Sequence, residues 1–580
     1  MNDKSRKTLE FEKILEQIAK FAFSKGAKDI IMALKPMQNK LKIERQLNEV
    51  EEAFKILYEH SLSPFFNVDD ITQALEKAAI MSVLSMGELL KISKMLRTSR
   101  NLQSLISKVN DETIVILKDI VSKIYIDNGL EESIDKAIIS ETEMSDHASG
   151  ALRNIRNKIR KIGENIKARL HNYISSPSYS KILQDNIVTI RNGRYVIPLK
   201  AEHRGAIPGL VHDQSSSGST IYLEPMAVVE MNNDLKTAMI EEDKEIERIF
   251  REFTVEISNN VDEIKISFEI ITYLDAVFAK AMYAESQKAV KPKINEDGYI
   301  NISKARHPLI KKEDVVANTI YLGKDFRMLF ITGPNTGGKT VCLKLCGLCV
   351  LMALSGVYVP AKEADIAIFE NVFCDIGDEQ SIEQNLSTFS SHMNNIKRII
   401  DNLTPNTLIL LDELGAGTDP AEGASLALSL AKYIHSQGAL AMITTHYNEL
   451  KEYAMITEGM QNASMEFDPE TYSPTYKLTI GIPGASNALL IAKKLGLKQE
   501  ILDSAQKGLQ GQKIEFEMVL SELEKTKREY EKNLLEIENL KIETLAAKKE
   551  AEVERNKLAT QKERLNQSVR KQTKILVERS

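Results

Sequence analysis

The segment from Met328 to Thr340 carries the glycine, lysine and threonine spacing of a phosphate-binding loop. In Gly333-Pro-Asn-Thr-Gly-Gly-Lys-Thr340, four residues separate the first glycine from Gly338-Lys339-Thr340. Glycines let backbone N–H groups turn onto phosphate oxygens, Lys339 reaches the β- and γ-phosphates, and Thr340 offers its hydroxyl to Mg²⁺. The sequence therefore predicts a site for a nucleoside triphosphate and Mg²⁺. Its predicted nucleotide contacts are Gly333, Pro334, Asn335, Thr336, Gly337, Gly338, Lys339 and Thr340.

Two later segments supply the groups that hydrolysis needs. Thr407-Leu-Ile-Leu-Leu-Asp-Glu413 reads as an apolar strand that ends in two carboxylates. Asp412 can hold Mg²⁺ through water, and Glu413 can polarise the attacking water. Met442-Ile-Thr-Thr-His446 reads as another apolar strand, and it ends in a candidate γ-phosphate sensor. We therefore assign catalysis to Lys339, Glu413 and His446, and metal binding to Thr340 and Asp412.

The elements around these residues follow an α/β pattern. A β-branched strand leads into the phosphate loop and a long apolar helix leaves it, so the helix N-terminus points at the anion. Turns, strands and helices alternate from 291 to 510, which predicts an α/β domain with a sheet core. From 511 to 580 the chain is rich in Glu and Lys. Apolar residues at heptad-like intervals (Leu520, Leu523, Leu534 and Leu540) predict a coiled coil or a long solvated helix there.

The residues before the ATPase pattern are expected to be mainly helical. Residues 1–125 show helical periodicity, for instance Phe11, Ile14, Leu15 and Ile18. Residues 126–290 are predicted to form long helices, continuous from 126 to 180, with a small β tip at 187–224. Asn192-Gly193 between two β-type runs is a strong hairpin signal. A β module between two long helices indicates a tip carried on an arm.

The β tip contains the candidate nucleic-acid contacts Arg191, Arg194, Lys200 and Arg204. A second basic run extends from Arg153 to Lys161 and is followed by Lys167 and Arg169. For the helical run, an ordinary solvated face is the favoured interpretation. A phosphate-binding role is better argued for the tip, because a β module on an arm has little other purpose.

Composition indicates a multidomain, cytoplasmic protein. The chain has 580 residues, 27% of them charged, a net charge of −6 and a pI near 6.0, so any nucleic-acid contact must come from a local patch. The N-terminus has no uninterrupted apolar core, which excludes a signal peptide. The apolar run from Val341 to Val359, interrupted by Lys344, is expected to form a buried helix and then a strand, so no membrane contact is expected.

The four cysteines are expected to be structural. Cys342, Cys346 and Cys349 share one helix face and are expected to pack in a core, while Cys374 stands alone. We therefore assign no metal and no disulfide.

Taken together, these motifs resemble the ATPase of the MutS family, and in particular its MutS-two branch. The resemblance rests on the phosphate loop, on Ser387-Thr-Phe389, on the segment from Asp412 to Gly423, and on Thr444-Thr-His-Tyr447. Thr336 and Asp419-Pro-Ala-Glu-Gly423 resemble this branch more than the mismatch-repair protein. Ala305-Arg-His-Pro-Leu-Ile310 matches the start of the family's ATPase domain, which makes His307 a candidate nucleotide contact. Tyr476-Lys-Leu and the region 484–497 match its dimerisation end.

The resemblance implies properties that spacing alone does not give. The ATPase is of the ABC type, and Ser387 would contact the γ-phosphate held by the opposite subunit, so the active unit is a homodimer. On spacing alone, the Ser387 segment is a helix cap. The helices before the ATPase domain correspond to the family's core and lever, and 187–224 to a clamp that closes around duplex or branched DNA. The chain starts at the lever region, so mismatch recognition is not expected.

One departure from the branch concerns its nuclease domain, which carries Leu-Asp-Leu-His-Gly and His-Gly-x-Gly motifs. None of the nine histidines here precedes a glycine. Either the chain is truncated or this member lacks the nuclease, and endonuclease activity is doubtful for these residues.

The function that follows is an ATP-hydrolysing homodimeric clamp. Two targets stay open: branched DNA, as in suppression of homologous recombination, and collided ribosomes that are split in quality control. The alternative is an SMC-like structural DNA-bridging ATPase, which would place the phosphate loop and the Asp-Glu strand at opposite chain ends. An ABC transporter subunit would carry Leu-Ser-Gly-Gly-Gln, which is absent.

Overall fold

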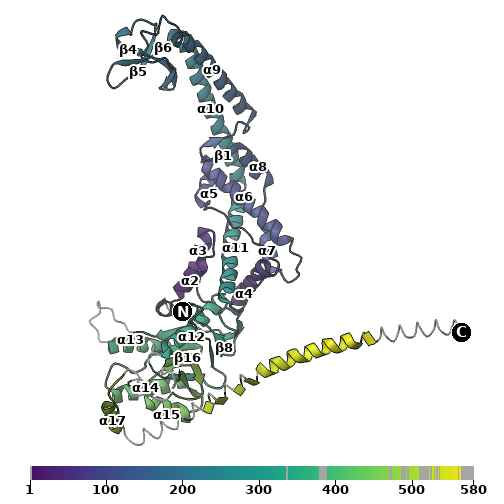
Figure 1. The fold of residues 1–580 in the computed structure, drawn as a ribbon, viewed down its shortest axis with the longest axis vertical. Coiled ribbons are helices and arrows are strands. Elements are labelled where there is room, and N and C mark those ends of the chain that lie inside the picture. Colours follow the sequence, from purple (N-terminus) through teal and green to yellow (C-terminus); the bar gives the residue numbers. More distant parts are fainter. Residues whose placement is uncertain are drawn as a thin grey trace, which may run out of the picture. The chain divides into compact units, whose positions relative to one another are not determined.

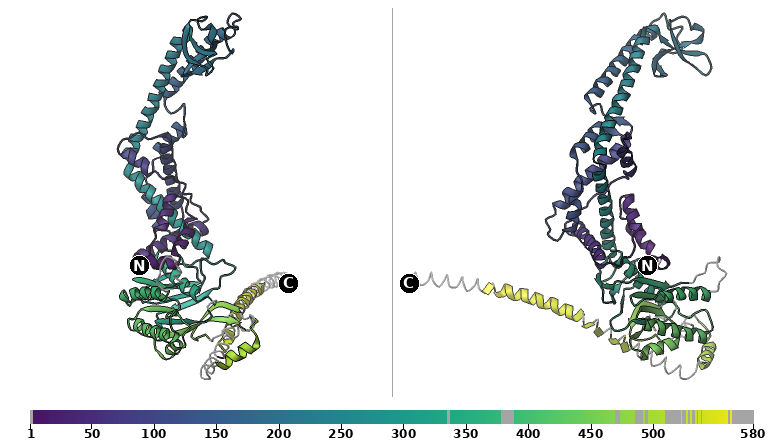
Figure 2. Two further views of the ribbon diagram at one scale, coloured as in Figure 1. Left: turned by 90° about the vertical axis from the view of Figure 1, so that its left-hand side faces the viewer. Right: turned by 180° about the vertical axis from the view of Figure 1, so that it is seen from behind.

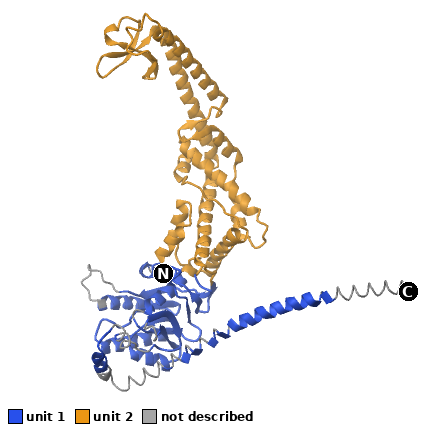
Figure 3. Ribbon diagram, in the orientation of Figure 1, with its two compact units in different colours: residues 1–10, 293–351, 360–580 blue, residues 11–292, 352–359 orange. Residues whose placement is uncertain are grey.

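A computed structural model describes most of the chain as two compact units (Figure 3). The described residues are 3–334, 337–377, 388–468, 473–484, 492, 496–508, 522, 526–527, 529–530, 533–534, 536–537, 539–559 and 561–562. Unit 1 comprises 1–10, 293–351 and 360–580, and unit 2 comprises 11–292 and 352–359. The two units are mixed α/β and largely helical, respectively, so the predicted combination of a helical part and an α/β part is confirmed.

Unit 1 is built on a six-stranded sheet with the order β12-β13-β14-β10-β15-β16. Its strands are parallel except β16, which runs antiparallel to β15. The strands are β10 (Met328–Thr332), β12 (Asn371–Asp375), β13 (Thr407–Leu411), β14 (Leu440–Thr444), β15 (Met460–Asp468) and β16 (Ser473–Ile480). Every residue of β10, β13 and β14 is buried, as expected for parallel strands covered on both faces.

Helices cover both faces of this sheet. One face packs on α13 (Thr388–Asp401), α14 (Pro420–Ser436) and α15 (Asn448–Ile456), which share a core cluster with Ile409 and Leu411. The opposite face meets α12 (Lys339–Leu354). There, a Cβ added at Gly347 would lie 2.7 Å from Leu410, so glycine allows the helix to approach the sheet closely. Cys342, Cys346 and Cys349 are buried on α12, which confirms their predicted packing role.

Unit 1 also contains a smaller sheet with the order β7-β11-β8-β9. Its strands are β7 (Lys293–Asn295), β8 (Ile300–Ala305), β9 (Asn318–Leu322) and β11 (Glu363–Ala367). Unit 1 also contains α1 (Asp3–Thr8) and α17 (Gln499–Gly508). The sequence predicts a strand at the end of the apolar run, directly after the helix, and this prediction is wrong. Of residues 355–359, only Val359 pairs, in an isolated bridge to Val290.

Unit 2 consists mainly of helices (Figure 1). They are α2 (Phe11–Ala19), α3 (Lys25–Met32), α4 (Lys40–Phe54), the π-helix Lys55–Glu59, α5 (Thr72–Ala79), α6 (Met86–Ser107), α7 (Ile116–Ser122), α8 (Asn128–Ala137), α9 (Gly150–Ile174), α10 (Met226–Asn259) and α11 (Val261–Gln287). The predicted stripe of Phe11, Ile14, Leu15 and Ile18 is fully buried on α2. The expectation of continuous helix from 126 to 180 is wrong, because β1 (Ile138–Ser140) and β2 (Glu143–Met144) form a short hairpin between α8 and α9.

A four-stranded sheet with the order β3-β4-β6-β5 lies at the end of the α9–α10 pair (Figure 2). Its strands are β3 (Thr189–Arg191), β4 (Arg194–Lys200), β5 (Gly209–Gln214) and β6 (Thr220–Pro225), with a 3₁₀ turn at Ala201–His203. Asn192 and Gly193 both have positive φ, at 51° and 72°, so the predicted tight hairpin is present. Leu170 of α9, Ile197 of β4 and Leu235 of α10 belong to one core cluster, so the sheet and helices fold as a module.

The segment after α17 is described only in part. Residues 539–559 are helical and exposed, as are the side chains of Leu534 and Leu540. Leu520 and Leu523 lie outside the described residues, so pairing into a coiled coil remains a prediction. Among the described residues, no helix combines the length and the apolar character needed to cross a membrane.

Candidate active site

The predicted catalytic residues meet at the carboxyl ends of neighbouring parallel strands. β13 pairs with β14 and β14 with β10, so their C-terminal ends share one edge of the sheet. The phosphate loop follows β10, Asp412 and Glu413 follow β13, and His446 lies just beyond β14. Ligands of open α/β sheets bind at this edge.

Lys339 is buried at the start of α12, with only 2% of its surface exposed. Its Nζ donates to the carbonyl oxygen of Gly333 at 2.8 Å and lies 3.1 Å from His446 Nε2. Burial lowers the pKa of Lys339 to about 8, although the carboxylates of Glu413 and Asp412 oppose this effect. Gly333 and Gly338 have φ values of 128° and 91°, which require glycine.

The carboxylate of Asp412 is fixed by two threonine hydroxyls. Thr340 Oγ1 donates to Oδ2 at 2.6 Å, and Thr444 Oγ1 donates to Oδ1 at 2.5 Å. The Thr444 hydroxyl also accepts the backbone N–H of Glu413 at 2.7 Å. Glu413 itself has φ of 48°, an uncommon conformation for a non-glycine residue that is often found at functional sites. Thr444 therefore links both carboxylate residues to β14.

Glu413 and His446 form a half-exposed pair. Glu413 Oε1 lies 3.2 Å from His446 Nε2, with side-chain exposures of 39% and 46%. The turn beyond Glu413 is closed by the hydroxyl of Tyr447, which donates to the carbonyl oxygen of Gly415 at 2.8 Å. Asp419 caps α14 by accepting the N–H groups of Ala421 and Glu422. The start of α14 therefore accounts for both residues: Asp419 is its N-cap, and Pro420 is favoured at the first helical position.

A cavity of about 490 Å³ opens beside these groups. Thr340, Asp412 and Glu413 line it, together with Asp375, which ends β12, and His392 of α13. Its other lining residues are Gly377, Met393, Ile396, Leu414, Gly415, Ala416 and Gly417. Its position beside Thr340 makes it a candidate site for the phosphate end of a nucleotide.

The residues around the cavity fit Mg²⁺ with a nucleotide. The Thr340 hydroxyl and the Asp412 carboxylate are hard oxygen donors 2.6 Å apart. Mg²⁺ in nucleotide sites takes one or two protein oxygens and completes its shell with phosphates and water. Among the described residues, no group of three or more His, Cys, Asp or Glu side chains is placed to hold a metal ion.

Some predicted site residues lie elsewhere or cannot be placed. Asn335, Thr336 and Ser387 lie outside the described residues. His307 is buried near Glu10 and Lys344 and is not among the residues that line the cavity. Burial lowers the pKa of His307 to about 4, and Lys344 adds to this effect while Glu10 opposes it. A role for His307 in nucleotide binding stays a prediction.

Sequence reasoning did not identify Thr444, Asp375 or His392 as parts of the site. The sequence does offer a signal for Thr444. Like Asp412, it is a polar residue at the end of a run of apolar strand residues. Asp375 and His392 carry no comparable signal. Their place beside Asp412 depends on β12 pairing with β13, which is a tertiary feature.

Comparison with known proteins connects this geometry to a family. The family model described as MutS domain V matches residues 329–513. "Endonuclease MutS2" of Clostridium botulinum (strain Kyoto / Type A2) is 46% identical over 554 residues, which cover 95% of this chain and 70% of the relative. The chain belongs to the MutS2 family. A Clostridium acetobutylicum protein of the same name is 47% identical over 93% of this chain and 69% of its own length. For the Clostridium novyi (strain NT) relative, the identity is 44% over 100% of this chain and 74% of that protein.

The predicted nucleic-acid residues of this MutS2 family member lie at two ends of the β3–β6 sheet. Arg191 and Arg194 flank the Asn192-Gly193 turn. Arg191 stacks on Tyr222, with 4.3 Å from its guanidinium carbon to the ring centroid, and lies 3.4 Å from Asp213. Arg194 is more enclosed and donates to the fully buried carboxylate of Glu224 at 2.7 Å.

Lys200 and Arg204 lie at the opposite end of the same sheet. Lys200 pairs in register with Thr220, next to the serine-rich turn 215–219, and its Nζ donates to the carbonyl oxygen of Lys181 at 3.0 Å. Arg204 is exposed. These two cations are therefore better placed than Arg194 to reach a phosphate group in solvent.

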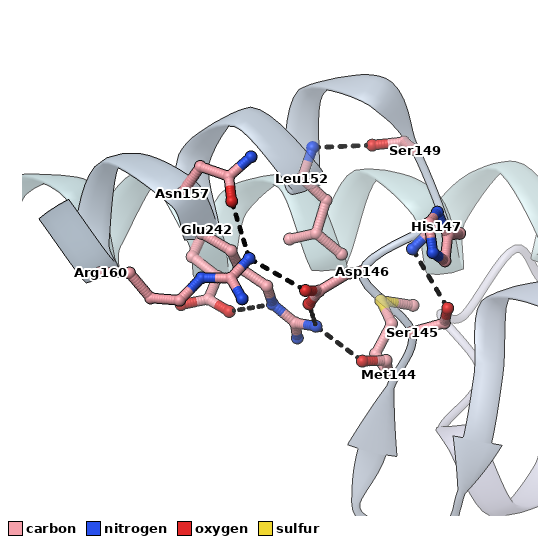
Figure 4. Close-up of polar contacts among 10 residues, drawn as sticks. Met144, Ser145, Asp146, His147, Ser149, Leu152, Asn157, Arg160 and Glu242 are labelled. Atoms are coloured by element: carbon pink, nitrogen blue, oxygen red, sulfur yellow. Dashed lines mark hydrogen bonds and ion pairs between the residues drawn. The ribbon is translucent and has the colours of Figure 1, made fainter.

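The basic run on α9 is largely compensated by acidic neighbours. Arg156 donates to Glu242 and Asp146, both at 2.7 Å, and Lys158 pairs with Glu241 at 3.0 Å. Arg160 reaches Asp146 at 3.1 Å (Figure 4). These ion pairs hold α9 against α10 and against the segment that precedes α9. They give this part of the run a structural role.

Proposed function

We propose that this chain is an ATP-hydrolysing homodimeric clamp that acts on DNA. The observation that carries the proposal is the convergence of Lys339, Thr340, Asp412, Glu413 and His446 at one sheet edge beside a cavity. Membership of the MutS2 family supports the same reading. A pure scaffold has no need for a buried lysine aimed at a glycine loop and a carboxylate pair.

In the proposed reaction, ATP binds with its phosphates on the loop 333–340. Lys339 leaves its contact with the Gly333 carbonyl and neutralises the β- and γ-phosphates. Thr340 and Asp412 would hold Mg²⁺, which supplies charge neutralisation at the phosphates. Glu413 takes the proton of the attacking water. His446 contacts both Glu413 and Lys339 and is the proposed sensor of the γ-phosphate. Ser387 would complete the site from the partner subunit.

The β3–β6 module is the proposed DNA-contacting part. Arg191, Lys200 and Arg204 are partly or fully exposed on it, whereas Arg194 of β4 pairs inside the module with Glu224 of β6. Phosphate contacts position DNA without reading its sequence, which suits branched or duplex DNA as the target and recombination intermediates as the biological setting. The endonuclease activity in the relatives' names is not part of the proposal for these residues.

The deciding experiment measures the ATPase rate with duplex DNA, with a four-way DNA junction and with stalled disomes, at matched salt. We expect DNA, and the junction above all, to stimulate turnover. Stimulation by disomes alone would move the target from DNA to the ribosome. Absence of both nucleotide binding and turnover in the wild-type chain would refute the ATPase assignment.

A further inference from the structure

Asp375 and His392 form a second carboxylate–imidazole pair beside the nucleotide cavity. His392 Nδ1 lies 2.8 Å from Asp375 Oδ2, and Asp375 is 8% exposed. Neither residue belongs to the phosphate loop, to the Asp412-Glu413 strand end or to the His446 strand end. They come from β12 and α13, on the side of Asp412 away from β14.

Asp375 ties this pair to the carboxylate strand. Its backbone oxygen accepts the N–H of Asp412 at 2.8 Å. Its other carboxylate oxygen accepts from the side-chain amide of Asn395, one turn after His392 on α13, at 2.9 Å. The same Asn395 amide donates to the carbonyl oxygen of Cys374 at 3.1 Å. Helix α13 is therefore anchored to the end of β12 without any need for His392.

His392 differs from Asn395 in facing the cavity. His392 lines the same space as Thr340, Asp412 and Glu413, whereas Asn395 is buried and does not line it. Because a carboxylate only accepts hydrogen bonds, the contact with Asp375 places a proton on Nδ1 and fixes the ring. Nε2 is the nitrogen that this bond does not use. An imidazole held by a carboxylate at the wall of a phosphate-binding cavity is a preorganised hydrogen-bonding group.

We propose that His392 is a further catalytic residue of this ATPase, which contacts the γ-phosphoryl group through Nε2 during hydrolysis, and that Asp375 is its positioning residue. The inference rests on the proposed ATPase function. In that reaction the oxygen of water bonds to the γ-phosphorus, the bond from the γ-phosphorus to the bridging oxygen breaks, and ADP leaves with the electron pair. The water proton passes to Glu413.

Two substitutions separate a catalytic role from an anchoring role. In H392N, the amide of asparagine can replace Nδ1 in the bond to Asp375, but nothing replaces Nε2. In N395A, an anchor of the same helix to the same carboxylate is removed, and none of the side chains that line the cavity is itself replaced. Thermal melting followed by circular dichroism shows whether each variant is folded, and H392A supplemented with free imidazole serves if H392N is not.

The measurement compares equilibrium binding of ADP with binding of ADP plus aluminium fluoride, which mimics the phosphoryl group in transfer. We expect H392N to bind ADP as the wild type does, but to lose about 100-fold of the added affinity for the fluoride complex, in line with removal of one transition-state hydrogen bond. Its kcat should fall by a similar factor with KM little changed, and N395A should keep the wild-type affinity ratio.

The proposal is overturned if H392N keeps the wild-type affinity ratio and kcat, or if N395A loses as much as H392N does. Either result would leave the ATPase assignment standing, because the wild-type chain would still bind and turn over nucleotide. A wild-type chain that binds neither ADP nor the fluoride complex would instead overturn the proposed function and this inference together.

Discussion

Lys339 Nζ lies 3.1 Å from His446 Nε2, and the same ring nitrogen lies 3.2 Å from Glu413 Oε1. One nitrogen cannot accept from the lysine and donate to the carboxylate at the same time. The contact that His446 makes therefore depends on where Lys339 points. If bound phosphates attract Lys339, as the proposed function requires, Nε2 is able to donate to Glu413, and nucleotide binding would then affect the candidate base.

The protonation of Lys339 makes ATP affinity dependent on pH. Burial lowers the pKa of Lys339 to about 8, and bound phosphates would favour the charged ammonium, so nucleotide binding should raise this pKa. At pH values below this pKa, Lys339 is already protonated and the affinity for ATP is at its maximum. As the pH rises above it, binding must take up a proton and affinity falls. Calorimetry at about pH 9 in two buffers of different ionisation enthalpy should detect this uptake.

Lys339→Ala should abolish the proton uptake and weaken ATP binding by about 10- to 150-fold, the worth of a charged hydrogen bond of about 1.5–3 kcal/mol. Lys344→Ala is the matched control, since Lys344 lies on the same helix but pairs with Glu10 at 3.0 Å. Equal proton uptake in wild type and Lys339→Ala would show that another group titrates.

Glu413→Gln should bind ATP normally and lose about 10²- to 10⁴-fold in turnover, because the amide cannot accept the proton of the attacking water. We further expect ATP to hold this variant as a closed dimer, visible as a doubled mass by light scattering. Glu422→Gln, in the first turn of α14, changes the same charge away from the cavity and should leave turnover unchanged. Normal turnover in Glu413→Gln would refute the base assignment.

Thr444→Val removes the hydroxyl that donates to Asp412 and accepts from Glu413, while keeping the shape of the side chain. Loss of a hydrogen bond to a charged group predicts about 1.5–3 kcal/mol lower stability, measured by urea unfolding. Turnover should fall as well, because both carboxylate residues lose their tie to β14. Thr445→Val is the comparison, since the Thr445 hydroxyl accepts the backbone N–H of Tyr447 at 3.1 Å. Similar turnover rates for the two variants would show that the Thr444 hydroxyl has no role in the active site.

The β module should reveal phosphate contacts through salt dependence. If Lys200 and Arg204 contact duplex DNA, replacing each by Gln should lower the slope of log affinity against log salt by about 0.9 per contact. Lys158→Gln removes the same charge from α9, where Lys158 pairs with Glu241, and should not change the slope. An unchanged slope in the Lys200 and Arg204 variants would exclude both from the interface. Arg194 is a poor probe, since its substitution also leaves the buried Glu224 without its guanidinium partner.

The sequence by itself determined the parts of this protein whose signal is local. The glycine loop, the apolar strands that end in Asp412 and His446, and the Asn192-Gly193 turn each depend on a few consecutive residues with a fixed backbone requirement. Helical periodicity likewise placed the buried stripe of α2. The local signal failed at 138–144, where β1 and β2 are joined at Glu141-Thr142, a turn without Gly, Pro, Asn or Asp.

Only the tertiary structure decided which distant residues share the site. The order of parallel strands brings β13 between β12 and β14, so that Asp375 and Thr444 flank Asp412 from two sides. The same packing buries Lys339 and thereby lowers its pKa, which no composition reveals. The tertiary structure also distinguishes Arg194, which pairs with the buried carboxylate of Glu224, from Arg204, which is exposed to solvent. Such distinctions arise because strand pairing and burial act between residues far apart in the chain, whereas motif spacing acts only along it.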